Sequence, residues 1–389
     1  MNDPRIGLAL SGGGSRAIAF HLGCLRALQD RGLLDRISVL SAVSGGSVIA
    51  AMWAYDGSDF EDFDRKVTRL LSRGLVWGIA RHTLASPETI RIIAAITVAG
   101  AAAAVGGAVK FGIGLLGLLR LRGTRLSGIS AACVAPVRRF ASRTTAFERF
   151  LATSLFAGRR MSDVARPGLD VVLNATELRT GTAFRFGSRQ SGCWRLGQLA
   201  EVPTVARAVA ASAAFPALLP SLDLRLDFEL RGELSRHRAI ITDGGVYDNL
   251  GITCMLPGRS DHFSTNAHRV DFIIACDAGL GLPSGTSKPY AWGSRMLATI
   301  NTIHRRTQTQ IYDLLHRMAT NREIDGFLLP YLGQQDDNLP YCPADLIARE
   351  DVMNYPTDFS PMSRDNIALL AGRGEQLTRL LLEIHAPHL

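Results

Sequence analysis

Runs of apolar residues that alternate with helical patterns divide the chain into strands and helices. Residues 5–10 form a short apolar run, residues 11–16 form a glycine-rich loop, and residues 17–31 carry apolar side chains at the spacing of an amphipathic helix. The same order returns at residues 37–43, an apolar run that leads directly into a second helical pattern. Two consecutive units of this kind predict neighbouring parallel strands, whose carboxyl ends share one edge of a sheet.

The strand and helix patterns resume after the middle of the chain. We expect strands at residues 169–176, 182–186, 222–230, 238–242 and 271–277, the second and fourth as hairpin partners, and long helices at residues 292–321 and 364–384. The whole pattern predicts an α/β fold with a mainly parallel central sheet covered by helices on both faces. We expect a single catalytic domain over residues 1–389, with a helical apolar insertion at about residues 75–130.

The insertion has the most unusual composition in the chain. Residues 92–109 carry no charge, and the apolar run resumes beyond Lys110 at residues 111–119. Eighteen helical residues span about 27 Å, slightly less than the ~30 Å hydrocarbon layer, and Lys110 would oppose a longer span. A buried Ala/Gly-rich hairpin and a segment that lies on or inserts into a membrane both fit the pattern, and a transmembrane helix fits it less well. Basic residues flank the run, as expected beside anionic head groups: Arg81, Arg91, Lys110, Arg120, Arg122 and Arg125.

Composition limits the classes of protein that fit. With 47% apolar and 20% charged residues, the chain can bury a substantial core, which excludes general disorder. The net charge of +8 suits an acidic partner surface, either nucleic acid or anionic lipid. The six cysteines are scattered without a Cys-x-x-Cys pair, which argues against a zinc site or disulfide scaffold and suits a reducing compartment. The first residues lead straight into a strand, so we expect no signal peptide and a cytoplasmic location.

Ser44 lies where a predicted strand turns at once into a helix. Small residues at positions 42, 45 and 46 allow a sharp turn that exposes the hydroxyl, as in a nucleophile elbow. An ordinary strand-to-helix turn has the same local pattern, and Ala42 replaces the first glycine of the usual Gly-x-Ser-x-Gly motif. The helix that follows would point its N-terminal N–H groups towards an oxyanion formed at Ser44.

The glycine-rich loop has three explanations. Three consecutive glycines before a helix would hold a nucleotide phosphate, form an oxyanion hole, or simply make a tight turn. The dinucleotide fingerprint would require a glycine where Ala17 stands, and no Gly-Lys-Ser/Thr follows as in a P-loop. The oxyanion hole gains support from the next strand, because parallel neighbours would bring the loop and Ser44 to the same edge.

A serine nucleophile also needs a base to take its proton. None of the nine histidines lies at a predicted strand end followed by a glycine turn. Asp243 does: it ends a predicted strand and is followed by Gly244 and Gly245, a pattern that is also common in surface turns. A carboxylate that accepts the serine proton directly is therefore the economical alternative to a histidine base.

Three motifs in this order resemble those of the patatin-like phospholipase family: Gly12-Gly13-Gly14-Ser15-Arg16, Val43-Ser44-Gly45-Gly46 and Asp243-Gly244-Gly245. Weaker likenesses occur at residues 174–176, 206–220 and 355–359. The resemblance implies a three-layer α/β/α fold and a catalytic dyad, with Ser44 as the nucleophile and Asp243 as the general base. It also implies that no metal ion, calcium included, and no other cofactor is needed.

The same resemblance implies an oxyanion hole in the glycine-rich loop. Backbone N–H groups of Gly13 and Gly14, with Gly12 beside them, would stabilise the oxyanion. Arg16 matches the basic position of the family's loop motif, where it would hold the loop or meet a lipid phosphate. Ala17 replaces the glycine that closes that motif, and the resemblance does not extend to residues 75–130.

We therefore expect a lipid acyl hydrolase of the phospholipase A or lysophospholipase type. Its partners would be an acyl-lipid substrate and an anionic membrane surface rather than nucleic acid, so the protein would be cytoplasmic and peripherally membrane-associated. Two alternatives remain open at this point: an acyltransferase with the same dyad, and a catalytically idle membrane-binding or scaffold protein. The sequence does not fix the oligomeric state.

Overall fold

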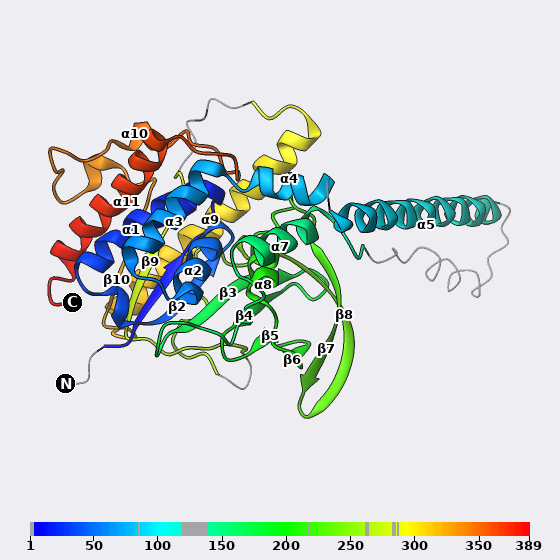
Figure 1. Cartoon of the computed structure of the whole chain (residues 1–389), viewed down its shortest axis with the longest axis horizontal. Helices are drawn as coiled ribbons and strands as arrows, with labels where there is room; N and C mark the ends of the chain where they lie inside the picture. Colours follow the sequence, from blue (N-terminus) through cyan, green and yellow to red (C-terminus); the bar gives the residue numbers. More distant parts are fainter. Residues whose placement is uncertain are drawn as a thin grey trace.

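The computed structural model describes residues 4–84, 86–118, 139–216, 218–260, 264–281, 285 and 288–389 (Figure 1). Within these residues the strands form one ten-stranded sheet, in the order β10-β9-β1-β2-β3-β4-β5-β6-β7-β8, with an additional pairing between β3 and β8. The strands are β1 (Ile6–Leu10), β2 (Ile37–Val43), β3 (Asp170–Glu177), β4 (Thr182–Gly187), β5 (Ser191–Cys193), β6 (Gly197–Leu199), β7 (Leu222–Leu230), β8 (Glu233–Asp243), β9 (Phe272–Cys276) and β10 (Gly326–Leu328).

The helices are α1 (Gly14–Asp30), α2 (Gly45–Asp56), α3 (Phe60–Arg73), α4 (Val76–Leu84), α5 (Pro87–Leu118), α7 (Arg143–Ser154), α8 (Val205–Ser212), α9 (Trp292–Thr320), α10 (Arg349–Val352) and α11 (Arg364–His385). The described residues also contain three short 3₁₀ turns: η1 (Leu34–Arg36), η2 (Gly244–Val246) and η3 (Asp336–Asn338).

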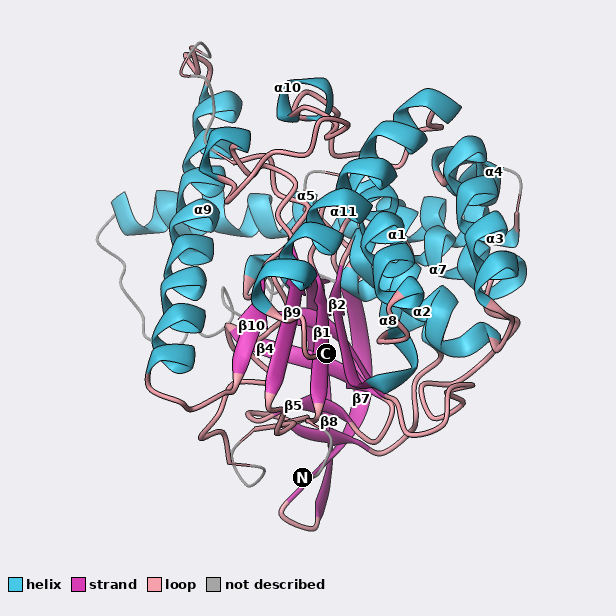
Figure 2. Ribbon diagram, turned by 90° about the vertical axis from the view of Figure 1, so that its left-hand side faces the viewer, coloured by secondary structure: helices cyan, strands magenta, loops and turns pink. Residues whose placement is uncertain are grey.

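One half of the sheet is parallel and lies between two layers of helices. Strands β10, β9, β1, β2 and β3 run in the same direction, and every residue of β1 and β9 is buried. Successive side chains of a strand point to opposite faces. Accordingly, Leu8 joins the apolar cluster formed with α1, α2 and α11, whereas Ala9 joins the cluster formed with α9. Figure 2 shows these strands with α9 on one side and α1 and α2 on the other.

The other half of the sheet is antiparallel and closes on itself. From β3 to β8 each strand pairs antiparallel with the next, and β8 pairs antiparallel with β3. These six strands form a closed antiparallel barrel that shares β3 with the parallel half. The predicted mainly parallel central sheet, and with it the three-layer architecture as the description of the whole fold, is therefore wrong.

Short strands explain why the sequence pattern did not indicate the barrel. β5 and β6 have three residues each, and Gly192 and Gly197 within them have φ angles of 148° and 105°. Too few residues are present there for an alternating pattern to develop. β7 and β8 are joined by Arg231 and Gly232, with φ angles of 56° and 82°, which is a two-residue hairpin turn in the left-handed region.

The apolar insertion begins as α4 and α5, and its remainder, residues 119–130, lies outside the described residues. One helix in the described part of the chain, Pro87–Ile113, is long and apolar enough to cross a membrane. Its first turns are anchored, because Ile92 and Ala95 pack against Ala141 and Ala146. Beyond them α5 extends away from the body (Figure 1), and only 17% of its most apolar window is buried. In the described part of the insertion, α5 is thus mostly exposed and not part of a buried hairpin.

Helices α1 and α11 approach each other backbone to backbone. A Cβ atom added to Gly23 of α1 would lie 1.8 Å from the carbonyl oxygen of Ala371, and one added to Gly374 of α11 would lie 2.2 Å from that of Phe20. These two glycines allow a contact that no side chain would permit. Because α1 begins at Gly14, this contact also fixes the end of the glycine-rich loop.

We expect Gly23→Ala to lower the free energy of unfolding by about 3 kcal/mol, because neither backbone can yield to the added methyl group. Urea denaturation followed by circular dichroism measures this change. The matched control is Gly107→Ala on α5, where nothing lies within 4 Å of an added Cβ atom. The control should leave stability unchanged or raise it slightly through helix propensity, and equal effects of the two substitutions would contradict the proposed contact.

Candidate active site

Ser44 occupies a strained turn between β2 and α2. Its φ and ψ angles are 52° and −119°, a conformation that residues other than glycine rarely adopt. The next two positions must be glycine, since added Cβ atoms at Gly45 and Gly46 would lie 2.2 Å from Gly14 O and 2.4 Å from Leu10 O. The turn therefore packs directly on the end of β1 and on the glycine-rich loop. Its strained serine is the geometry expected of a nucleophile elbow.

The glycine-rich loop lies against this turn. An added Cβ atom on Gly12 would be 3.3 Å from the Cβ atom of Ser44, and Gly13 and Gly14 have φ angles of 147° and 60°. The N–H group of Gly12 donates to the carbonyl oxygen of Asn249 at 3.2 Å. By contrast, no acceptor among the described residues takes the N–H groups of Gly13 or Gly14. Gly13 and Gly14 thus have free donors, whereas Gly12 has already used its own.

Arg16 holds the loop from behind. It is 6% exposed, and its Nε atom donates to the carbonyl oxygen of Ala278 at 3.0 Å. Its Nη1 atom donates to the carbonyl oxygen of Tyr355 at 3.2 Å and to the hydroxyl of Thr357 at 2.7 Å. Burial lowers the pKa of Arg16 to about 10, which still leaves the guanidinium charged at neutral pH. These contacts fit positioning of the loop better than contact with a lipid phosphate.

Asp243 is a buried carboxylate at the end of β8. Its Oδ1 atom accepts the N–H group of Gly245 at 2.7 Å, and its carbonyl oxygen accepts the hydroxyl of Thr176 at 2.9 Å. Its Oδ2 atom is buried and has no hydrogen-bond partner in the described part of the chain. Burial raises the pKa of Asp243 to about 6, against the smaller opposing effects of the Gly245 N–H and the Ser44 hydroxyl. The Ser44 hydroxyl is thus near enough to the Asp243 carboxylate to lower its pKa, although the two groups form no well-aligned hydrogen bond.

Strand β3 brings Ser44 and Asp243 together. On one edge, β4 covers β3 from Val172 onward. On the other edge, β2 pairs in parallel up to Val43 opposite Asn174, and β8 pairs antiparallel from Asp243 opposite Ala175. The carboxyl ends of β2 and β8 therefore meet head to head on adjacent residues of β3. The serine that follows β2 and the aspartate that ends β8 consequently face each other.

A polar network that the motif analysis did not identify supports the turn at Ser44. The hydroxyl of Ser212 on α8 accepts the Ser44 N–H at 3.0 Å and donates to the carbonyl oxygen of Asn174 at 2.6 Å. The Asn174 side chain in turn donates to Ala42 O at 3.0 Å and to Ser41 Oγ at 2.8 Å. Asn174 and Ser212 both lie in segments whose likeness to the family is weak, residues 174–176 and 206–220, and Ser212 is the sole hydroxyl of α8.

The two departures from the family motifs are accommodated. Ala17 lies within α1 and Ala42 within β2, and both are fully buried. Neither has a positive φ angle, so the methyl group causes no backbone strain. No histidine among the described residues hydrogen-bonds to Ser44 or Asp243. The site thus combines a strained hydroxyl, a buried carboxylate with a raised pKa and two free N–H donors, which suits proton transfer beside a developing negative charge.

Comparison with known proteins identifies the family. The model of the patatin-like phospholipase family matches residues 8–255, which is 248 of 389 residues (255 − 8 + 1) and so more than half of the chain. No curated protein matches the chain.

Several solved structures are similar to the chain at low sequence identity. Human GIVD cytosolic phospholipase A2 aligns with a TM-score of 0.52 and 14% identity over 97% of this chain and 61% of that protein. VipD from Legionella pneumophila aligns with a TM-score of 0.43 and 15% identity, over 98% and 67% of the two chains. The type III effector ExoU from Pseudomonas aeruginosa aligns with a TM-score of 0.34 and 16% identity, over 98% and 53%.

At this identity the human enzyme supports the fold alone, and the chain spans only 61% of that protein's length. The family itself follows from the sequence match. Because that match extends over more than half of its residues, the chain belongs to the patatin-like phospholipase family.

Proposed function

We propose that this chain hydrolyses acyl esters of lipids, with Ser44 as the nucleophile and Asp243 as the general base. Family membership supports lipid acyl hydrolysis in general terms. The observation that carries the specific proposal is the head-to-head meeting of β2 and β8 on β3, which leaves a strained serine beside a buried carboxylate. The proposal concerns this chain alone, since its structural relatives are longer proteins.

Each step of the proposed reaction uses a group already described. Ser44 Oγ attacks the ester carbonyl carbon while Asp243 takes the hydroxyl proton, and a tetrahedral oxyanion forms. The carbon–oxygen bond to the leaving alcohol then breaks, and Asp243 returns the proton to that alcohol, which leaves an acyl-enzyme. Water attacks the acyl-enzyme with Asp243 again as the base, so that the fatty acid departs and Ser44 recovers its proton.

The oxyanion would be stabilised by backbone donors. We assign this role to the N–H groups of Gly13 and Gly14, which have no acceptor among the described residues. The N–H group of Gly45, the residue after the nucleophile, is a third donor by the general geometry of an elbow. Gly12 would shape the site rather than donate, because Asn249 already accepts its N–H. Arg16 would position the loop.

Membrane association is part of the proposal. Apart from the residues that anchor it, α5 exposes large apolar side chains, among them Ile93 at 59% and Ile96 at 60%. Water would solvate this helix poorly, and an apolar layer would cover it. The net charge of +8 and basic residues near the base of the helix, such as Arg81 and Arg91, favour an anionic surface. We propose that α5 inserts into or lies on an anionic membrane and brings the site to its lipid substrate.

Ser44→Ala should lower esterase turnover by about 10³-fold or more, because the nucleophile is lost while the oxyanion donors remain. Hydrolysis of a short-chain soluble ester and of phospholipid vesicles measures the loss, and the melting temperature should stay close to that of the unchanged protein. The matched control is Ser38→Ala on the preceding strand β2, whose hydroxyl donates to Ile6 O at 3.0 Å. Retained turnover in Ser44→Ala would contradict the assignment of Ser44 as the nucleophile.

The rate should depend on the ionisation of Asp243. Since burial raises its pKa to about 6 and the base must be ionised, log kcat/KM should rise with pH below about 6 and level off above it. Chromatography of the released acid measures this profile without interference from a pH-sensitive chromophore. Asp243→Asn should remove this rise of log kcat/KM with pH and lower the rate at pH 8 by about 10²- to 10⁴-fold.

Stability provides the control for this prediction. A carboxyl whose pKa is raised by folding stabilises the folded chain at pH values below its unfolded pKa, and the contribution is lost as pH rises through about 6. Asp243→Asn should therefore melt no lower than the unchanged protein at pH 8, while the exposed Asp227→Asn should keep the full rate. A normal rate in Asp243→Asn would point to a different base.

Replacing Ile93 and Ile96 together by Asp should weaken binding to anionic vesicles by about 10-fold or more, because carboxylates are costly in the apolar layer. Co-sedimentation with vesicles of phosphatidylcholine and phosphatidylglycerol measures binding, and hydrolysis of a soluble ester should be unaffected. Leu234→Asp, at a residue that is 70% exposed near the β7–β8 turn, is the control and should bind normally. Equal binding of all three proteins would contradict a membrane role for α5.

A further inference from the structure

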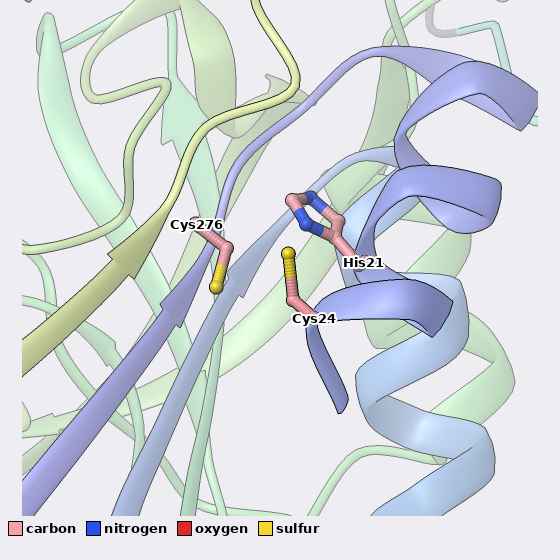
Figure 3. Close-up of side chains that lie close together, drawn as sticks. All are labelled: His21, Cys24 and Cys276. Atoms are coloured by element: carbon pink, nitrogen blue, oxygen red, sulfur yellow. The ribbon is translucent and has the colours of Figure 1, made fainter. Parts of the chain in front are cut away.

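Three buried side chains with metal-binding atoms meet next to the glycine-rich loop. His21 and Cys24 lie three residues apart on α1, and Cys276 is the last residue of β9 (Figure 3). All three are 0% exposed, and one ligand atom from each lies within 4.8 Å of the other two. In the described part of the chain, no other group of His, Cys, Asp or Glu gathers in this way.

The hydrogen bond of His21 leaves a lone pair at this cluster. Its Nε2 atom lies 2.9 Å from the carbonyl oxygen of Ser11, which can only accept, so Nε2 carries the proton. Nδ1 is then the unprotonated nitrogen, and it is buried without a partner among the described residues. Figure 3 shows the imidazole ring next to the sulfur of Cys24, with Cys276 across from it. An N–H bonded to a carbonyl, with the opposite nitrogen free, is the arrangement that orients metal-bound histidines.

The donor set selects the class of ion. Two sulfur atoms and one imidazole nitrogen favour soft or borderline ions such as Cu(I) and Zn²⁺ over Mg²⁺ or Ca²⁺. With two thiolates and a neutral imidazole, Zn²⁺ would give a site of zero net charge, which suits complete burial. Cu(I) would suit a set of only three ligands. Metal–ligand bonds of about 2.0 to 2.3 Å place ligand atoms about 3.5 to 4 Å apart, so small side-chain rotations would close the site.

Ser11 connects the cluster to the loop. Its carbonyl oxygen faces His21, its N–H group donates to the carbonyl oxygen of Cys276 at 3.1 Å, and its hydroxyl accepts the N–H of Ala278 at 2.8 Å. Ser11 immediately precedes Gly12. An ion bound by the three side chains would therefore fasten α1 to the end of β9 at the root of the glycine-rich loop.

We propose that His21, Cys24 and Cys276 bind one thiophilic d¹⁰ metal ion, Zn²⁺ or Cu(I), as a structural clamp beside the glycine-rich loop. The site is separate from the proposed ester hydrolysis. It requires no redox step: the two thiols release their protons to solvent when the ion binds.

Metal binding to the full chain tests the proposal. Protein stripped with a chelator under reducing conditions is dialysed against Zn²⁺ or, without oxygen, against Cu(I) buffered by glutathione, and bound metal is measured by mass spectrometry. We expect one ion per chain from at least one of the two solutions and a higher melting temperature in the loaded protein. Competition between the two ions identifies the preferred one. If Zn²⁺ is preferred, Co²⁺ in its place should produce the near-ultraviolet charge-transfer absorption of a thiolate-bound ion, and if Cu(I) is preferred, the Cu(I)-loaded protein should show the corresponding ultraviolet thiolate band.

Variants locate the ion. Cys24→Ser, Cys276→Ser and His21→Gln should each weaken binding by about 100-fold or more, because each removes a ligand. Cys193→Ser, at a buried cysteine of β5 outside the cluster, is the matched control and should bind like the unchanged protein. Circular dichroism establishes that each variant is folded.

Two results would overturn the proposal. The first is that neither ion binds the unchanged protein stoichiometrically, which would make the cluster ordinary core packing. The second is that folded Cys24→Ser binds as tightly as Cys193→Ser. If the ligand variants fail to fold, the ultraviolet thiolate charge-transfer band of the unchanged protein loaded with Co²⁺ or with Cu(I) decides alone, and its absence with both ions overturns the site.

Discussion

The site depends on one strand edge that two other strands share. β3 pairs with β2 along its first half and with β8 along its second half, and these partners run in opposite directions. Two strands that pair end to end along the same edge of β3 bring their carboxyl ends together only if they run in opposite directions, because with equal directions the carboxyl end of one would meet the amino end of the other. The closed antiparallel barrel follows from this requirement. The chain leaves β3, passes through β4 to β7 and must return along β8 in the reverse sense so that Asp243 arrives opposite the end of β2.

Bringing these groups together is costly, and the surrounding residues supply the stabilisation. A non-glycine residue in the conformation of Ser44 costs of order 1–3 kcal/mol, and a buried carboxylate with an unpaired oxygen costs more. The hydrogen bonds of Ser212 and Asn174 hold the Ser44 turn, and those of Gly245 and Thr176 hold Asp243. Such a conformation persists because its surroundings leave it no alternative. The same burial that destabilises the Asp243 carboxylate makes it a better proton acceptor.

The sequence predicted the parts of the site that depend on local backbone conformation. Glycines at sharp turns and an aspartate at a strand end have short-range causes, and all of them lie where the motifs indicated. It did not predict the barrel, because the shortest strands have too few residues for an alternating apolar pattern. It also did not predict the hydrogen bond from the Gly12 N–H to the carbonyl oxygen of Asn249. It also argued against a metal site from the spacing of the cysteines. Cys24 and Cys276 are 252 positions apart (276 − 24), and they meet because β1 pairs with β9 and α1 packs on these strands.

The glycine-rich loop shows how rigidity is achieved where side chains are absent. Glycines have the largest conformational entropy to lose, so a loop of three would move unless its flanks were fixed. Ser11 is held at one end by β9 and His21, and Arg16 is held at the other by Ala278 and Thr357. The loop can then present free N–H groups in one fixed direction. Fixed donors stabilise a developing charge without reorganising during the reaction, which is where an oxyanion hole gains its effect. The rigidity of this loop therefore arises from its neighbours, and any clamp at its root acts on the same property.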